Sequence, residues 1–153
     1  MAANRTQDHC DLIVFDGNCL LCGGSVGFLY RRDRRRRFRY VPLQSAAGRL
    51  IADRHGLDIE DPTTFVAVLK GEPRYMSDGV FGALQRLGGF WRAAIALRVI
   101  PPFLRNGAYR IFARNRYRWF GQRTCKLSEE PWRDLMIERI EDLPSALMGD
   151  LPA

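Results

Sequence analysis

The feature that most constrains the fold is a short apolar run that ends in a turn and leads directly to two cysteines. Leu12-Ile13-Val14-Phe15 is continuous, apolar and rich in β-branched and aromatic residues, which predicts a buried strand. Asp16-Gly17-Asn18 is a turn cluster, and from Cys19 to about Arg35 apolar residues recur at helical spacing. The chain therefore opens with a strand–turn–helix unit that carries Cys19-Leu20-Leu21-Cys22 at the start of its helix.

The elements that follow define a mixed α/β order. We predict a strand at 38–41, a helix at 46–55 with Gly56 as its C′ residue, strands at 64–69 and 74–76 joined by a turn at 70–72, and a helix that Ser77 or Asp78 caps and that runs through Leu87. The order β-α-β-α-β-β-α, one βαβ unit followed by a hairpin and a helix, is the layout of the thioredoxin-like fold.

Further helices are predicted after this core. We expect a single domain over 1–153, with the thioredoxin-like core at 11–88 and a helical extension at 90–127, which holds helical segments at 90–99 and 102–119. Residues 128–153 are expected to form a C-terminal helix and tail. The helix would run from Pro131 to about Leu143, because Trp132, Leu135, Met136 and Leu143 fall on one face of such a helix.

Composition restricts the class and the compartment. A chain with 46% hydrophobic and 27% charged residues is globular rather than disordered or fibrous. Four cysteines are too few for a secreted disulfide scaffold, and neither a signal peptide nor a transmembrane segment is recognisable. We therefore expect a cytoplasmic protein with reduced thiols. The net charge of +7, carried mostly by arginine, favours binding to nucleic acid, acidic lipid or an acidic partner, and does not distinguish among these three.

Cys19 and Cys22 lie where a helix start would activate a thiol. Unpaired backbone N–H groups and the positive end of the helix dipole stabilise a thiolate, which is the species that attacks a disulfide. The two-residue spacing lets the second sulfur reach the first within one turn. We predict a thiol-disulfide oxidoreductase with no cofactor and no metal, in which Cys19 is the exposed nucleophile and Cys22 the more buried resolving thiol. Its partner would be a disulfide-bearing protein or a low-molecular-weight thiol.

Asp16 completes the predicted catalytic residues. It lies three residues before Cys19, at the end of the predicted strand. Its carboxylate could cap the helix, anchor the turn, or accept a proton during exchange. These three roles remain open at the level of sequence.

The chain resembles the DCC family of predicted thiol-disulfide oxidoreductases. The family's Asp-x-x-Cys-x-x-Cys signature is met by Asp16, Cys19 and Cys22. Three further stretches are similar to family features: Val41-Pro42-Leu43-Gln44-Ser45, Asp78-Gly79-Val80, and Asn115-Arg116-Tyr117-Arg118-Trp119-Phe120-Gly121. The resemblance covers roughly residues 11 to 127 and implies a thioredoxin-like fold, but it leaves the physiological substrate open.

The resemblance also suggests residues that contact a substrate. Thioredoxin-like proteins usually place a cis-proline before the third strand, where its backbone receives the substrate disulfide. Pro62 is the candidate here, although counting back from the Lys70-Gly71 turn places Thr63 at the equivalent position. Asn115 and Arg116 could line the same groove. We therefore expect substrate contacts from Pro62, Thr63, Asn115 and Arg116.

Two other functions remain alternatives. A Cys-x-x-Cys pair also supplies two ligands of a zinc site, with Cys125, Cys10 and the histidines as the remaining candidates. An arginine-rich module that binds nucleic acid or another partner is the second alternative. The run Arg31–Arg37 is interpreted first as the solvated end of the cysteine-bearing helix and otherwise as a contact for an acidic partner. Cys125 is either a passive thiol or a third redox thiol.

Overall fold

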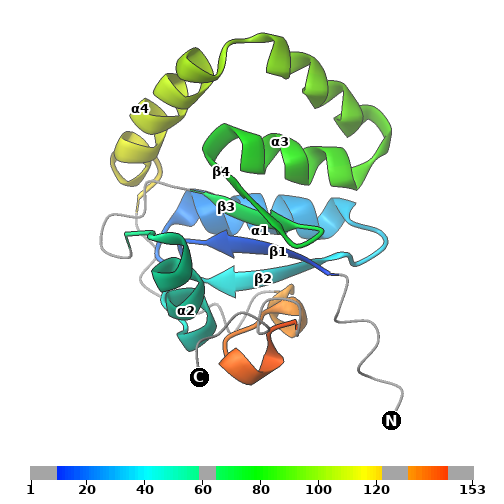
Figure 1. Ribbon diagram of the computed structural model, residues 1–153, viewed down its shortest axis with the longest axis vertical. Coiled ribbons are helices and arrows are strands. Elements are labelled where there is room, and N and C mark those ends of the chain that lie inside the picture. Colours follow the sequence, from blue (N-terminus) through cyan, green and yellow to red (C-terminus); the bar gives the residue numbers. More distant parts are fainter. Residues whose placement is uncertain (1–9, 59–64, 122–130, 145–153) are drawn as a thin grey trace.

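A four-stranded sheet forms the centre of the part of the chain that the computed structural model describes, residues 10–58, 65–121 and 131–144. The strand order is β2-β1-β3-β4 (Figure 1). β1 and β2 are parallel, whereas β3 is antiparallel to both β1 and β4. The strands are β1 (Asp11–Phe15), β2 (Phe38–Pro42), β3 (Val66–Leu69) and β4 (Glu72–Tyr75).

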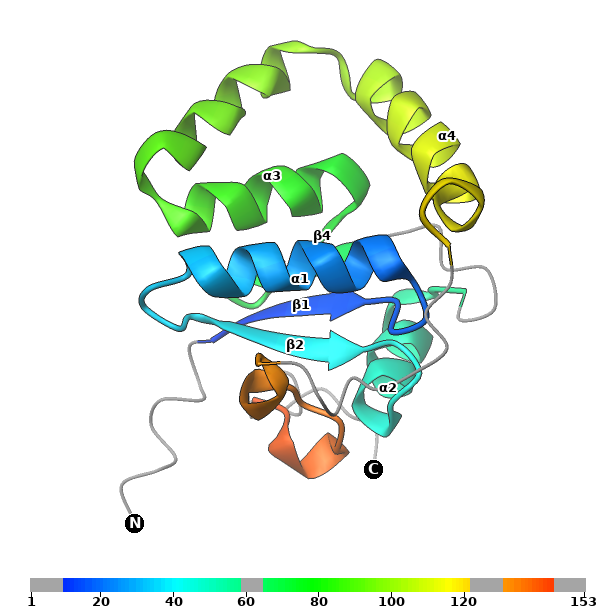
Figure 2. The ribbon, with the colours of Figure 1, turned by 180° about the vertical axis from the view of Figure 1, so that it is seen from behind.

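Helices cover both faces of this sheet. α1 and α3 lie on one side and α2 on the other, while η1 and α4 form an arch beyond α3 (Figures 1 and 2). Their bounds are α1 (Leu20–Arg32), α2 (Ala46–His55), α3 (Met76–Leu87), the 3₁₀-helix η1 (Gly89–Val99) and α4 (Pro102–Phe120). The mixed α/β class and the predicted element order are confirmed and are consistent with a thioredoxin-like fold.

The central strand β1 supplies side chains to two separate cores. Successive side chains of a strand point to opposite faces, so Leu12 and Val14 face one way and Ile13 and Phe15 the other. The first pair belongs to a buried cluster with α2, and the second to a cluster with α1 and α3. The helical members are Ala47, Ile51 and Ala52 in the first cluster and Val26, Leu29 and Ala83 in the second. A central strand with helices on both sides therefore needs apolar side chains on both faces, which Leu12 to Phe15 supply.

The ends of two helices test the predicted capping residues. Gly56 ends α2 in the left-handed conformation with φ 62°, as predicted. The predicted cap of α3 is wrong: the helix begins at Met76, and Tyr75 precedes it without a side-chain cap. Ser77 and Asp78 bind α4 instead. The Ser77 hydroxyl donates to Asn106 Oδ1 at 2.7 Å, and Asp78 accepts from Arg105 Nη1 at 3.0 Å.

The predicted α-helix at Pro131–Leu143 is also wrong. This segment forms two short 3₁₀ turns, η3 (Arg133–Leu135) and η4 (Ile140–Asp142), and between them it pairs with the edge strand β2. Met136 bridges Tyr40 in parallel, and the Ile137 N–H donates to the Tyr40 carbonyl at 2.9 Å. Trp132 packs in the α1/α3 core, whereas Ile137 and Leu143 pack in the α2 core. One helical face cannot serve both sides of a sheet, so the chain crosses the sheet edge in extended form.

The arginine run at 31–37 is largely exposed, as expected, and some of its side chains also make contacts within the protein. Arg32 stacks over the Phe28 ring at 4.1 Å, and Arg36 stacks over the Tyr30 ring at 3.8 Å. Arg37 Nη1 donates to the Arg86 carbonyl at 3.0 Å. Arg31, Arg32, Arg34, Arg35 and Arg36 are nevertheless exposed, which is consistent with the solvated end of a helix. The acidic partner at Arg31–Arg37 stays a prediction.

Candidate active site

The two cysteines lie at the junction of β1 and α1. Cys19 is the N-cap residue of α1, with extended backbone angles of φ −93° and ψ 122°. Its Sγ accepts a hydrogen bond from the Cys22 N–H at 3.4 Å, and its own N–H donates to the Asp16 carbonyl at 3.2 Å. A sulfur at the N-cap takes the place of the serine or aspartate oxygen that usually accepts this N–H. The two cysteines are not joined by a disulfide in this structure.

The surroundings give the two cysteine thiols different pKa values. Hydrogen bonding from the Cys22 side chain lowers the pKa of Cys19 to about 6, although burial opposes the change. The Cys22 and Leu21 backbone and the positive charge of Arg116 lower the Cys19 pKa further. The pKa of Cys22 is raised, first because its side chain is hydrogen-bonded to Cys19 and then because of burial. Near neutral pH the proton of the pair therefore resides on Cys22, and Cys19 carries the negative charge.

The exposure of the two cysteines is the reverse of the prediction. Cys19 is 0% exposed, whereas Cys22 is partly exposed. The Cys19 side chain folds back over the first turn of α1 to accept the Cys22 N–H, and this position removes it from solvent. A substrate sulfur reaches Cys19 only if the atoms that cover it move.

Asp16 is the centre of a buried hydrogen-bond network. Its Oδ1 accepts from the Asn18 N–H at 3.0 Å and from Gln44 Nε2 at 2.7 Å. Its Oδ2 accepts from Arg116 Nη2 at 3.0 Å and from the Tyr117 hydroxyl. Gln44 also fixes the turn directly, because its Oε1 accepts from the Gly17 N–H at 3.0 Å. The turn before Cys19 is thus tied to β2 through Gln44 and to α4 through Arg116 and Tyr117.

These contacts distinguish among the three roles considered for Asp16. The carboxylate binds the N–H of Asn18 within the turn, while the N-cap of α1 is Cys19. Four donors, one of them the guanidinium of Arg116, already use the lone pairs of the carboxylate. These four donors hold the carboxylate in place, and through it they hold the turn. The geometry is that of a loop anchor.

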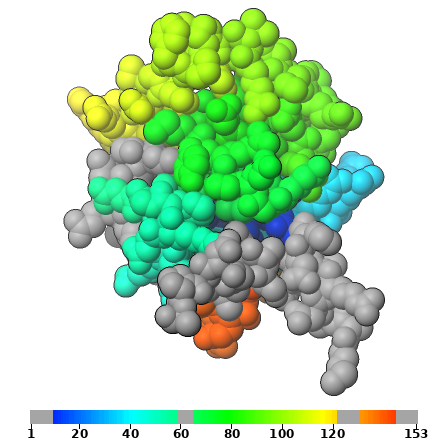
Figure 3. All heavy atoms as spheres, viewed as in Figure 1, coloured from blue at the N-terminus to red at the C-terminus, as the bar shows by residue number. Residues whose placement is uncertain are grey.

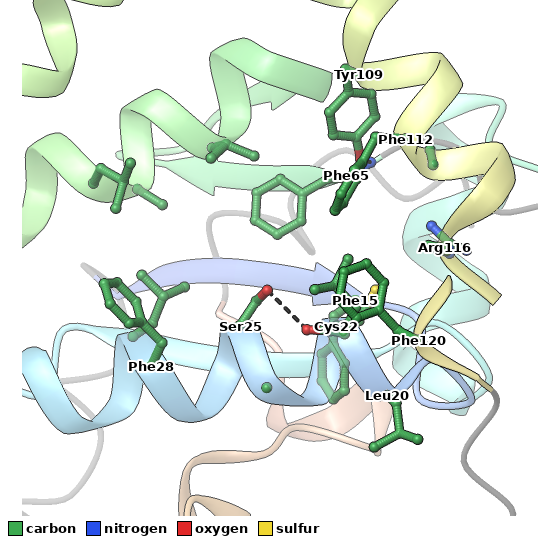
Figure 4. Close-up of a pocket in the computed structure, with 17 residues that line it drawn as sticks. Phe15, Leu20, Cys22, Ser25, Phe28, Phe65, Tyr109, Phe112, Arg116 and Phe120 are labelled. Carbon is green, nitrogen blue, oxygen red and sulfur yellow. Dashed lines mark hydrogen bonds between the residues drawn. The ribbon is translucent and has the colours of Figure 1, made fainter. Parts of the chain in front are cut away.

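An apolar cavity opens beside Cys22, between α1, α3 and α4. Its volume is about 770 Å³, and Cys22 and Arg116 lie on its wall (Figure 4). The rest of the lining is mainly aromatic and aliphatic and includes Leu20, Phe28, Phe65, Leu84, Phe112 and Phe120. The polar side chains on the wall are largely engaged elsewhere: the Ser25 hydroxyl donates to the Leu21 carbonyl, and the Tyr109 oxygen accepts from the Phe65 N–H at 2.8 Å. Burial raises the pKa of Tyr109 to about 12, so its hydroxyl stays neutral.

Comparison with known proteins assigns the chain to a family. The DCC1-like thiol-disulfide oxidoreductase family matches residues 13–122, which include the two cysteines, Asp16 and the segment of α4 that binds Asp16. The chain belongs to this family. The uncharacterized protein YuxK of Bacillus subtilis is 32% identical over 117 residues, covering 76% of this chain and 85% of that protein. A chloroplastic DCC family protein of Arabidopsis thaliana is 33% identical over 123 residues, covering 79% and 72% of the two chains. No solved structure gives a significant match.

Within this DCC1-like chain, the residues predicted from sequence are only partly brought together. Cys19, Cys22, Asp16 and Arg116 form one cluster. Asn115 does not join it: its side-chain amide donates to the Ile111 carbonyl one turn earlier in α4. Pro62, Thr63 and Cys125 lie outside the described residues, so their predicted roles stay predictions.

Sequence reasoning did not assign roles to Gln44 and Tyr117, which the structure places on Asp16. Both lie inside the stretches that carry the DCC resemblance, Val41–Ser45 and Asn115–Gly121. A signal was present, because a carboxylate at the end of a buried strand needs several donors and these stretches supply them.

Two further observations bear on the alternatives. Among the described residues, no group of three or more His, Cys, Asp or Glu side chains is arranged to hold a metal ion. The same part of the chain contains no helix long and apolar enough to cross a bilayer. The cytoplasmic location expected from the sequence stays a prediction.

Proposed function

We propose that this DCC1-like protein exchanges its Cys19–Cys22 dithiol with the disulfide of a substrate. The observation that carries the proposal is the N-cap position of Cys19, where hydrogen bonds from Cys22 hold the sulfur as a thiolate with a pKa of about 6. Cys22 remains a thiol beside it, because its own pKa is raised. One activated nucleophile and one protonated neighbour are what a two-step exchange requires.

The exchange balances without a further reactant. The Cys19 thiolate attacks one sulfur of the substrate disulfide, so a Cys19–substrate disulfide forms and the other substrate sulfur leaves as a thiolate. Cys22 then attacks the Cys19 sulfur, a Cys19–Cys22 disulfide forms, and the second substrate sulfur leaves and takes the proton of Cys22. The substrate disulfide is reduced by two electrons to two thiols, and the protein dithiol is oxidised by the same two electrons. The reverse sequence oxidises a substrate dithiol.

In this scheme Asp16 and Arg116 are positioning residues. Asp16 holds the turn that presents Cys19, and Arg116 neutralises Asp16 while its positive charge favours the thiolate. The proton that Cys22 releases passes to the departing substrate sulfur, and Asp16 takes no part in that transfer.

The cavity supports a preference for apolar groups next to the substrate disulfide. Cys22 lies on a wall that is mainly aromatic and aliphatic, and Leu20, Phe112 and Phe120 on its margin are partly exposed. A substrate whose disulfide is flanked by an aromatic or aliphatic group would bury that group there. A disulfide-bearing protein with such a side chain and a low-molecular-weight aryl disulfide both fit this description.

Trapping of the covalent intermediate tests the proposal. A Cys22→Ser variant should accumulate a mixed disulfide on Cys19 when it is mixed with an aryl-alkyl disulfide, because the resolving thiol is absent. The matched Cys19→Ser variant should form little adduct, and the wild type should release the product thiol and end as a Cys19–Cys22 disulfide, seen by mass spectrometry. Equal adduct formation by the two serine variants would overturn the assignment of Cys19. Dibenzyl disulfide and hydroxyethyl disulfide, which both release ordinary alkyl thiols, provide the apolar and the polar substrate for comparing the effect of the cavity.

A further inference from the structure

The arch formed by η1 and α4 exposes an unusual amount of apolar surface. In η1 the Phe90 and Val99 side chains are 84% and 86% exposed, and none of the element's residues is buried. In α4 Phe103 is 74%, Ile111 62% and Trp119 55% exposed. η1 and α4, which carry these residues, are consecutive in the chain and form one margin of the molecule (Figure 3). Large apolar patches on a folded surface mark an interaction site.

The charge of the same segment is of one sign. From residue 89 to residue 121 the sequence contains seven arginines and neither aspartate nor glutamate. Arg98 and Arg105 face inward to Asp78, at 3.8 and 3.0 Å, and Arg116 faces Asp16. Arg110, Arg114 and Arg118 are exposed on the outside of α4. The outer surface of the arch is therefore both apolar and positively charged.

On α4 the two properties are arranged in adjacent stripes. Leu104, Ala108 and Ile111 are exposed and follow one another at intervals of four and three residues, which places them on one line along a helix. Arg110, Arg114 and Arg118 repeat every four residues and form a parallel line beside it. An apolar stripe flanked by arginines, with a tryptophan and a phenylalanine near the ends, suits contact with a surface that is both apolar and negatively charged.

We propose that the outer face of η1 and α4 binds the surface of a bilayer that contains anionic lipid. The exposed Phe, Ile, Leu and Trp side chains would enter the headgroup boundary, and the arginines would pair with lipid phosphates. The protein would lie on the membrane without spanning it. The inference goes beyond thiol exchange and does not rest on it.

The charge pattern favours lipid over a second copy of the chain. In a symmetric dimer the same patch would face itself, so the arginines of one α4 would oppose those of the other without an acidic residue between them. An anionic bilayer supplies negative charge and an apolar phase in one surface, which complement the arginines and the exposed apolar side chains of the arch. An acidic protein would match the arginines, but it would leave the widely spaced side chains Phe90 and Phe103 without an apolar phase to enter.

Vesicle binding by the full chain tests this inference. We expect co-sedimentation with vesicles of phosphatidylcholine containing a third phosphatidylglycerol, with weaker binding to phosphatidylcholine alone and at high salt. Each arginine near such a surface contributes about fivefold to the partition coefficient at low salt, so replacing Arg110, Arg114 and Arg118 with glutamine should weaken binding about 100-fold. Trp119 fluorescence should shift to shorter wavelength in the bound wild type, and a Trp119→Phe variant should show little of that shift.

A charge-matched variant separates a local surface from net charge. Arg49 lies in α2, Arg133 in η3 and Arg139 just before η4; all three are exposed, and these elements lie at the end of the molecule opposite the arch (Figure 1). Replacing these three with glutamine should weaken vesicle binding less than about fivefold, because they do not face the proposed surface and salt screens their charge from it. The proposal would be overturned if the two triple variants lost binding equally, or if the protein did not bind anionic vesicles. It would also be overturned if sedimentation equilibrium showed a dimer that the α4 substitutions dissociate. Circular dichroism of each variant confirms that it is folded, and a Cys19→Ser variant should bind vesicles like the wild type.

Discussion

Replacing Arg116 with glutamine would leave the carboxylate of Asp16 buried without its counter-ion. Arg116 Nη2 lies 3.0 Å from Asp16 Oδ2, and only 7% and 2% of the two side chains are exposed. Removing one partner of a buried ion pair costs about 3–5 kcal/mol, because the remaining charge is uncompensated. Asn18, Gln44 and Tyr117 still donate to Asp16 in the variant, so we expect a loss near about 3 kcal/mol.

Urea unfolding of the reduced protein measures this loss. With a denaturant slope of about 2 kcal/mol/M, the unfolding midpoint of Arg116→Gln should fall by about 1.5 M. Adding Asp16→Asn removes the second charge and should restore part of the stability, with a coupling free energy of about 2 kcal/mol between the two positions. Arg118→Gln is the matched control, because Arg118 is exposed on the same helix and its loss should change the stability by less than about 0.5 kcal/mol.

Equal stabilities of Arg116→Gln and Arg118→Gln would contradict this expectation. Simple addition of the effects of Arg116→Gln and Asp16→Asn would contradict it as well. Either result would mean that water solvates the Asp16 carboxylate as well as the guanidinium does, and that α4 does not hold the turn before Cys19 by charge.

Four further measurements follow from the site and the sheet. The alkylation rate of Cys19 in the reduced protein should titrate with a midpoint near pH 6. Cys22→Ala should move that midpoint upward, because the Cys22 side chain is the largest cause of the lowered pKa. An unchanged midpoint would show that the Cys22 side chain does not lower the Cys19 pKa. Because the Cys19 pKa is lower in the folded than in the unfolded chain, the reduced wild type should gain stability relative to Cys19→Ala as the pH rises from 6 toward about 8.5, and a constant difference would contradict this. Replacing Arg34 and Arg35 with serine should leave the Cys19 alkylation rate within about twofold. α1 separates these arginines from Cys19 by about 20 Å, well beyond the Debye length. A much larger fall in rate would mean that the helix is disrupted. Ile137→Ala should cost about 2–5 kcal/mol in urea unfolding, whereas a loss below about 1 kcal/mol would show that the segment beside β2 is not part of the core.

The sequence predicted correctly those helices, strands and turns that are specified by residues close to one another in the chain. The apolar run at 12–15, the turn after it and the helical spacing after Cys19 specify β1 and the start of α1 within one residue, although α1 ends at Arg32 rather than near Arg35. Gly56 ends α2 in the left-handed conformation because glycine tolerates positive φ without strain, and this too can be predicted from a few neighbouring residues.

The predictions that were wrong depend on distant partners. The apolar spacing of Trp132, Leu135, Met136 and Leu143 is compatible with a helix, but the open edge of β2 and the two cores beside it hold the segment extended. The exposure of Cys19 could not be predicted from its position alone. Its sulfur accepts the Cys22 N–H instead of facing solvent, and this orientation depends on the folded turn. Similarly, the helical pattern of α4 does not show that Arg116 faces Asp16 rather than water.

The distance along the chain between Asp16 and its donors on α4 has a consequence for the order of folding. Arg116 and Tyr117 follow Asp16 by 100 and 101 residues. Closing a flexible loop of that length costs about 4 kcal/mol of chain entropy before the contacts form, which favours a late place in the folding sequence. On a ribosome that adds about 5–20 residues per second, the segment with Arg116 is synthesised about 5–20 seconds after Asp16. We therefore expect the β1–α1 turn of a nascent chain to remain unanchored until α4 docks, so that the dithiol acquires its final environment only when most of the domain is already in place to enclose it.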